Sequence, residues 1–296
     1  MFKPVIKWSG SKRSQSEIIK SYLPDTFNTY YEPFIGGGSM LYAICPSKAV
    51  CGDICSPLID LWNEIKEKPK HLAEEYRIRW TKLQEEGYQI YYDIRDEFNR
   101  NRKPEDLLFL SRTCVNGLIR FNSDGNFNNS LHHTRPGIAP DSLKKIIFDW
   151  SKRIQCAEFI ACEYFESTSK AKKGDLVYLD PPYFHTKGRY YGTIDFERFL
   201  NYLESLNQRG IKYMLSLPEA LLSEEEHFFR NQLNIEYKWS DFEKLNQRLP
   251  EGYRWEQMEF KASIFHQSTA PFWKWNRKYV SFDGYLKLYI LMIISC

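Results

Sequence analysis

The chain has 296 residues, of which 43% are hydrophobic and 27% are charged. This composition supports a packed core and excludes a disordered or fibrous protein. There are 41 Lys and Arg against 38 Asp and Glu, so the formal net charge is only +3. Any contact with nucleic acid must therefore come from a local patch of the surface.

The N-terminus lacks the apolar segment of a signal peptide, and no apolar stretch ahead of the C-terminal tail approaches the roughly 20 residues that span a membrane. The tail at 286–294 is apolar but short, and it predicts an edge strand. We therefore expect a cytoplasmic protein with no membrane partner. The seven cysteines form no CxxC pair and no cluster with His, which favours reduced thiols and predicts no metal site.

The N-terminal segment alternates between predicted helices and strands. Apolar spacing predicts a helix over 11–23, which Pro24 ends. A short strand at 30–31 leads into a glycine cluster, a helix follows near 39–45, and a second strand covers 49–51. This order predicts the opening of a Rossmann-like α/β unit.

The composition changes after this unit. Residues 57–102 are rich in helix formers and charges and predict a helical insertion. Residues 112–140 are rich in Asn, Gly, Ser and His, which disfavours regular structure, and a long loop of this kind is usually functional. An α/β pattern then returns, with helices predicted over 141–154 and 195–208 and strands over 157–160, 175–179 and 211–217.

A glycine-rich segment, Glu32-Pro33-Phe34-Ile35-Gly36-Gly37-Gly38, follows the first predicted strand. Glycine suits a sharp backbone turn that a ligand approaches closely. Ligands of open α/β sheets bind beyond the carboxyl ends of the strands, so this loop is a candidate cofactor site. Asp53 follows the second strand, where its carboxylate can accept hydrogen bonds from both ribose hydroxyls. The structural alternative is a hairpin turn and a helix-capping Asp.

A second motif, Asp180-Pro181-Pro182-Tyr183, directly follows the apolar strand predicted over 175–179. The prolines fix the backbone and remove two N–H donors, which leaves the Asp180 carboxylate and the Pro181 carbonyl as acceptors. Acceptors beside an aromatic ring suit a flat group that bears an NH₂, with Tyr183 stacked on its face. The alternative is an ordinary Asp-Pro turn with a packed Tyr; the apolar strand and the upstream glycine loop favour the functional interpretation.

The chain resembles the Dam-like DNA adenine N6-methyltransferases in five segments that occur in the family's order: 7–12 (KWSGSK), 32–38, 52–54 (GDI), 112–128 and 180–183. Each segment is weak alone, but the five together are specific and cover most of the chain. The resemblance implies an α/β fold in which a Rossmann-like methyltransferase sheet carries a mainly helical target-recognition insertion. The implied domains are a catalytic domain, 1–60 and 157–296, and a target-recognition domain, 61–156.

The resemblance also implies S-adenosylmethionine on the glycine loop, with Asp53 on its ribose. Asp180, Pro181 and Tyr183 would bind an adenine flipped out of double-stranded DNA. A cognate restriction endonuclease is a further candidate partner, whereas the oligomeric state is left open. The implied cofactor-binding residues are Trp8, Lys12, Phe34, Gly36, Gly38, Asp53 and Asp180.

The polar segment 112–135 supplies the candidate DNA-binding residues. Asn suits adenine edges and Arg suits guanine or phosphate, although Asn-rich loops also form turns. Family members that methylate GATC carry a basic residue ahead of a Gly-x-Phe-Asn step, where this chain has Ser123-Asp124. We therefore expect a recognition sequence other than GATC. The candidates are Arg112, Asn116, Arg120, Asn122, Asp124, Asn126, Asn128 and Arg135.

Direct methyl transfer needs neither a cysteine nucleophile nor a metal. Hydrogen bonds from the adenine amine to Asp180 and Pro181 favour a pyramidal nitrogen whose lone pair faces the methyl group. Two alternatives stay open at this point, namely an RNA adenine methyltransferase and a catalytically silent DNA-binding protein of the same fold. The intact motif residues argue against the silent protein, and Asp at position 180 argues against a protein-glutamine methyltransferase.

Overall fold

The computed structural model describes residues 2–134, 137–182, 194–218 and 289–294. Residues 1–217 and 291–296 form one compact unit, and residues 218–290 form a second. Tyr183 and Arg135, two of the predicted site residues, lie outside the described residues. Among the described residues, no helix is both long and apolar enough to cross a membrane.

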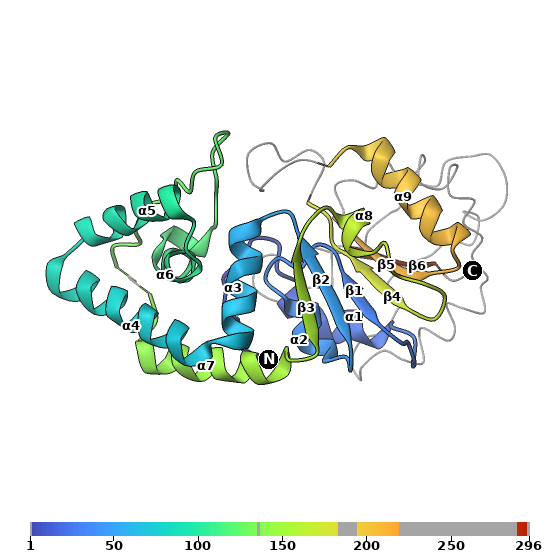
Figure 1. Ribbon diagram of the computed structural model, residues 1–296, viewed down its shortest axis with the longest axis horizontal. Coiled ribbons are helices and arrows are strands. Elements are labelled where there is room, and N and C mark those ends of the chain that lie inside the picture. Colours follow the sequence, from blue (N-terminus) through green and yellow to red (C-terminus); the bar gives the residue numbers. More distant parts are fainter. Residues whose placement is uncertain (1, 135–136, 183–193, 219–288, 295–296) are drawn as a thin grey trace, which may run out of the picture. The chain divides into compact units, whose positions relative to one another are not determined.

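A parallel sheet organises the first unit (Figure 1). Its spatial order is β3-β2-β1-β4-β5-β6, in which β1 pairs in parallel with β2 and β4, β2 with β3, and β4 with β5. The chain order reverses at the junction of β1 and β4, which is the Rossmann-like arrangement predicted from the sequence. The strands are β1 (Tyr30–Glu32), β2 (Ala49–Asp53), β3 (Ala157–Ala161), β4 (Leu176–Leu179), β5 (Lys212–Pro218) and β6 (Tyr289–Ile294).

The central strands are buried along their whole length. Every residue of β1 and of β4 is buried, as is usual for parallel strands that are covered on both faces. Figure 1 shows α1 (Ser16–Ser21) and α2 (Ser39–Ile44) on one face of the sheet and α8 (Tyr164–Ser167) and α9 (Phe196–Gln208) on the other. The carboxyl ends of β1 and β4 therefore meet between two helical layers.

A group of helices between β2 and β3 confirms the predicted helical insertion. Prolines stand in the first turns of four of these five helices, where the missing N–H is not needed, so Pro69 begins a helix and does not break one. The helices are α3 (Ser56–Glu67), α4 (Pro69–Glu86), α5 (Gln89–Asn101), α6 (Pro104–Thr113) and α7 (Pro140–Arg153).

Two tryptophans connect the insertion to the sheet. Trp62 on α3 and Trp150 on α7 are fully buried, with ring centroids 5.2 Å apart, and Trp62 also stacks on Phe159 of β3. The Trp62 Nε1–H donates to the Gly36 carbonyl at 3.0 Å. One hydrophobic core therefore runs from the insertion to the glycine loop, and the domain boundaries at 60/61 and 156/157 stay a prediction.

The sequence-based elements differ from the structure at several places, which include the unpredicted short helix α8. The helix expected over 11–23 is a 3₁₀ turn (Lys12–Ser14) followed by the short α1, because Lys12 turns inward and is only 3% exposed. Helix α6 was not predicted, and it places Arg112 in a helix instead of a loop. The C-terminal edge strand is confirmed as β6.

We expect Phe98→Ala to lower the free energy of unfolding by about 3–5 kcal/mol, the usual cost of removing a buried ring. Phe98 on α5 is fully buried and packs against Phe121 and Phe127. Urea unfolding followed by far-UV circular dichroism measures the loss. The control is Ile78→Ala, because Ile78 is 39% exposed and its truncation should change the free energy by about 0.5 kcal/mol at most. Equal effects of the two variants would contradict the prediction.

Candidate functional site

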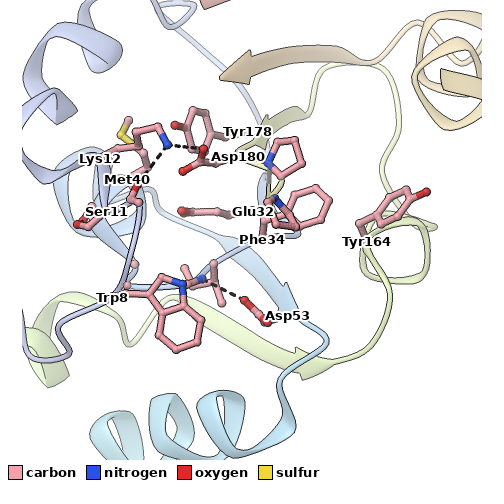
Figure 2. A pocket seen from close by; sticks show the side chains of 18 of the residues that line it. Trp8, Ser11, Lys12, Glu32, Phe34, Met40, Asp53, Tyr164, Tyr178 and Asp180 are labelled. Atoms are coloured by element: carbon pink, nitrogen blue, oxygen red, sulfur yellow. Dashed lines mark hydrogen bonds and ion pairs between the residues drawn. The ribbon is translucent and has the colours of Figure 1, made fainter. Parts of the chain in front are cut away.

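One pocket lies where the carboxyl ends of β1, β2 and β4 meet (Figure 2). Its position matches the strand-order reversal, where open α/β sheets bind ligands. The pocket contains all seven residues predicted to bind the cofactor, together with Pro181. The lining side chains and glycines include Trp8, Lys12, Glu32, Phe34, Gly36, Gly38, Asp53, Glu163, Tyr164, Tyr178, Asp180, Pro181 and Pro182.

The glycine loop is pressed between two indole rings. Gly36 has φ +44°, and a Cβ there would lie 2.8 Å from the Trp8 ring. Gly38 has φ +65°, and its Cβ would lie 2.8 Å from Trp62. Both a left-handed backbone and a lack of space therefore require glycine at these two positions. Gly36 and Gly38 therefore present main-chain atoms, and not side chains, to the pocket.

Asp53, the last residue of β2, holds the loop and faces the pocket. Its Oδ2 accepts a hydrogen bond from the Gly36 N–H at 3.2 Å, and its Oδ1 accepts one from the Cys55 N–H at 3.0 Å. Burial raises the pKa of Asp53 to about 6, against the lowering effect of these backbone donors. At neutral pH the carboxylate is mostly ionised and can accept further hydrogen bonds from a ligand.

The buried Lys12 and the half-buried Asp180 form an ion pair at the opposite side of the pocket. The Lys12 Nζ contacts Asp180 Oδ1 and also donates to the Gly10 carbonyl at 3.2 Å. Burial raises the pKa of Asp180, and the neighbouring Lys12 cation opposes that rise. Lys12 was predicted to bind the cofactor, and in the structure its ammonium contacts the carboxylate of the second motif.

The sequence analysis missed the role of two acids in the pocket. Glu32 is 3% exposed, and its Oε2 accepts a hydrogen bond from the Tyr30 hydroxyl at 2.9 Å. Glu163 follows β3 and forms a capping box with Glu166 at the start of α8. The sequence contains a signal that could have found both acids, because each stands at or just after the carboxyl end of a predicted strand, as Asp53 and Asp180 do.

Aromatic rings form one wall of the pocket. Phe34 stacks on Tyr164 with centroids 5.4 Å apart, and Phe199 of α9 packs edge-on against both rings. Tyr164 is only 4% exposed but still lines the pocket. Tyr164 therefore belongs both to the packed interior and to the wall of the pocket.

The polar segment after α6 forms a hairpin, which in Figure 1 is the green loop extending past α5 and α6. Phe121 and Phe127 pair across it in antiparallel fashion, and the Asn122 N–H donates to the Asn126 carbonyl. The Asn99 side chain of α5 donates to the Phe127 carbonyl at 3.0 Å and accepts from its N–H at 2.8 Å. The hairpin is thus anchored to the helical insertion at its base.

Several predicted DNA-binding residues have structural partners within this hairpin. Asn122 Oδ1 accepts from the backbone N–H groups of Asp124 and Asn126, and Asn126 Oδ1 accepts from Arg102 at 3.0 Å. The Arg120 Nε–H donates to Asn128 Oδ1 at 2.8 Å. The exposed candidates are Asn116, Arg120, Asn122, Asp124 and Asn128, whereas Asn126 is half-buried.

The predicted contact of Arg112 with DNA is corrected. Arg112 lies in the last turn of α6, is 7% exposed, and donates from Nε to the Val5 carbonyl at 2.9 Å and from Nη2 to the Pro4 carbonyl. Its guanidinium is used to tie the N-terminal segment to α6. The sequence placed it in the loop because the composition of residues 112–140 hid the end of the helix.

A family model of the D12 class N6 adenine-specific DNA methyltransferases matches residues 8–246. The chain belongs to this family. It is 31% identical over 247 residues to a type II methyltransferase of Methanocaldococcus jannaschii, covering 72% of this chain and 83% of that one. A type II methyltransferase of Lactococcus lactis subsp. cremoris is 28% identical over 243 residues, covering 75% and 84%. The DNA adenine methylase of Escherichia coli is 28% identical over 236 residues, covering 74% and 82%.

The family membership confirms the resemblance read from the five segments. The chain is an adenine-specific DNA methyltransferase, so DNA is its substrate class and its reaction requires a methyl donor.

Lys12→Met should move the acidic limb of the kcat–pH profile to higher pH. The substitution removes the cation that lowers the pKa of Asp180, so this carboxylate takes up a proton at a higher pH than in the wild type. Lys12→Arg keeps the charge and should keep the limb in place. Methyl transfer measured from pH 5 to 9 tests both variants, and an unshifted limb in Lys12→Met would show that Lys12 does not control Asp180.

Proposed function

We propose that this enzyme transfers a methyl group from S-adenosylmethionine to the exocyclic amine of an adenine that is flipped out of a specific sequence in double-stranded DNA. The observation that carries the proposal is the convergence of the glycine loop, Asp53 and Asp180 in one pocket at the strand-order reversal. The glycine loop on the proposed cofactor side follows β1, and Asp180 on the proposed target side follows the neighbouring strand β4.

The pocket has the features that this cofactor requires. Asp53 offers a carboxylate for ribose hydroxyls, and the glycine loop lets the ligand approach the main chain. Phe34 and Tyr164 provide a flat wall for the adenine ring, and Trp8 lies beside Gly36 toward the methionine end. When bound, S-adenosylmethionine supplies an electrophilic methyl group on a sulfonium.

Asp180 and Pro181 act on the target amine. Lys12 engages Asp180 Oδ1, and we assign Asp180 Oδ2 and the Pro181 carbonyl as acceptors for the two N–H groups of the adenine. Hydrogen bonds to these two acceptors draw the amine toward a pyramidal geometry and align its lone pair for attack. Alignment of this kind supplies up to about 7–11 kcal/mol of a barrier in well-oriented reactions. Tyr183 is proposed to stack on the flipped base, as its place in the motif implies.

The exposed face of the hairpin is proposed to read DNA. Asn116, Arg120 and Asp124 are exposed on it, and their side chains suit base edges and phosphates. Because the relatives named type II methyltransferases include two at 28% and 31% identity, a cognate restriction endonuclease is a proposed partner.

Asp180→Ala should reduce methyl transfer by about 10² or more, because the variant loses an acceptor that positions the target amine. Cofactor affinity should change little. Duplex DNA, single-stranded DNA and RNA are incubated in parallel with the enzyme, digested to nucleosides and analysed by mass spectrometry for N6-methyladenine. Asp149→Ala serves as the control, because Asp149 is exposed and contacts Tyr42 away from the pocket. Near-normal turnover of Asp180→Ala would remove the assignment, and methylation of RNA alone would change the substrate.

Asp53→Ala should weaken the binding of S-adenosylmethionine by about 10- to 100-fold, since hydrogen bonds to charged groups contribute about 1.5–3 kcal/mol. Calorimetric titration of the DNA-free enzyme gives the dissociation constant. Asp53→Asn retains the shape of the side chain and separates loss of charge from loosening of the glycine loop. An unchanged dissociation constant in both variants would assign the ribose to another residue.

The recognition sequence is expected to differ from GATC, because Asp124 is an acceptor at an exposed position and is repelled by phosphate. Long-read sequencing of DNA from cells that express the enzyme reports its methylated adenines. Asp124→Ala should then relax one position of the site by about 1–3 kcal/mol, and Arg120→Ala should weaken binding to every sequence if it contacts phosphate. Methylation restricted to GATC would refute this expectation and leave Asp124 as a turn residue beside Gly125.

A further inference from the structure

Glu32 is a buried carboxyl in the cofactor pocket to which the reaction described above gives no task. It is the last residue of β1, is 3% exposed, and lines the pocket. In Figure 2 its side chain lies between the Lys12–Asp180 pair and the part of the pocket formed by Trp8 and Asp53. A carboxyl in this place faces whatever ligand the glycine loop holds.

The groups that face Glu32 leave it without a cation of its own. Tyr30 donates its hydroxyl hydrogen to Oε2 at 2.9 Å from the same strand, and Cys51 faces it from β2. Asp180, which follows β4, adds negative charge, and the Lys12 ammonium is already bound to Asp180. Tyr178 of β4 completes this surrounding through its interaction with Tyr30. In the part of the chain that the structure describes, Glu32 forms no ion pair.

Burial, followed by the charge of Asp180, raises the pKa of Glu32 to about 8, although the Tyr30 hydrogen bond opposes the rise. In the free enzyme at neutral pH this side chain is therefore mostly a neutral carboxylic acid. A cation brought into the pocket would favour the carboxylate, because unit charges interact strongly in a site that excludes water.

We propose that Glu32 distinguishes the methyl donor from the spent product by charge: it is neutral in the free enzyme and ionises when a sulfonium ligand enters the pocket. This inference rests on the proposed function, since the sulfonium is that of S-adenosylmethionine. The O–H bond of the carboxyl breaks, its electron pair stays on the carboxylate, and the proton leaves to solvent. No group is oxidised or reduced.

The consequence is selective release of the product. S-adenosylhomocysteine has the same ribose, adenine and amino-acid groups as the donor but no sulfonium charge. The product keeps the α-ammonium group but lacks the sulfonium. We place Glu32 beside the sulfonium because its side chain lies between the Asp53 side and the Asp180 side of the pocket (Figure 2), where the methyl group would be transferred. Once the methyl group has left, Glu32 takes up a proton again and this attraction is lost. Affinity for the donor should rise with pH and level off above about 8, while affinity for the product should stay nearly flat.

The test is calorimetric titration of the DNA-free enzyme at pH 7.0 in phosphate and in Tris, whose different ionisation enthalpies report the number of protons exchanged. S-adenosylmethionine should release most of one proton per site, because Glu32 is mostly protonated at that pH, and S-adenosylhomocysteine should release roughly none. Asp53, with a pKa of about 6, can contribute only about 0.1 proton at pH 7.0.

Glu32→Gln is the matched variant, because the amide has the shape of the protonated acid but cannot ionise. We expect it to release less than about 0.2 proton, to bind the donor about tenfold more weakly, and to bind the product within about twofold of the wild type. Glu32→Asp keeps an ionisable group and should keep proton release. Equal proton release in the wild type and Glu32→Gln, or none in the wild type, would overturn the proposal.

The experiment separates this inference from the proposed function. If S-adenosylmethionine binds but no proton is released, only the role of Glu32 is contradicted. If neither S-adenosylmethionine nor S-adenosylhomocysteine binds, the cofactor assignment is contradicted. If Glu32→Gln fails to fold, as judged by circular dichroism, the pH dependence of donor affinity in the wild type decides. A flat dependence between pH 6.5 and 8 would then overturn the proposal.

Discussion

The parallel pairing of β1 with β4 brings together two segments that are far apart in the chain, and every feature of the site depends on it. Tyr30 lies opposite Leu176 and Tyr31 opposite Val177, so both strands end at the same edge of the sheet. The glycine loop follows β1, and the Asp180 motif follows β4, so both leave the sheet at this edge. A shift of register by one residue would turn the following side chains to the opposite face. The buried rows of β1 and β4 hold the register, because all of their residues are packed.

The helical insertion supports the pocket through two tryptophans that pack against the glycine loop. Trp62 and Trp150 pack against each other beneath Gly38, and Trp62 binds the Gly36 carbonyl. The glycine loop is thus held between a residue of the N-terminal segment, Trp8, and a residue of the first insertion helix. The pocket and the helical insertion that carries the hairpin therefore share one hydrophobic core, and precise positioning of reacting groups requires a rigid support of this kind.

Motifs and apolar periodicity predicted most of the sheet and its ligand-binding edge. Strands β2 to β5 were found from short apolar runs, and Asp53 and Asp180 from their places directly after such runs. These predictions succeed because the local pattern and the tertiary position have the same cause, namely burial of parallel strands on both faces. The four-residue helix α8 lacks a periodic signal and was missed.

Contacts between distant segments were beyond the reach of the sequence. Arg112 was predicted to contact DNA because the residues that follow it are polar. Its guanidinium instead donates hydrogen bonds to the carbonyls of Pro4 and Val5 in the N-terminal segment. Lys12 was predicted to bind the cofactor, and nothing in the sequence indicated that it also pairs with Asp180, which follows β4. A charged side chain carries no local mark of which buried group it pairs with, since that depends on the folded chain.

The hairpin shows why an Asn-rich composition predicts neither recognition nor turn formation alone. The side chains of Asn99 and Asn122 form hydrogen bonds with backbone groups of the hairpin, which makes the loop rigid. Arg120 and Asp124 stand on that rigid frame with exposed side chains. Because the frame is built by other residues, the exposed positions can change without loss of the loop. Relatives with the same fold can therefore read different sequences through a few substitutions at such positions, and Asp124 is the position at which this chain departs from the GATC pattern.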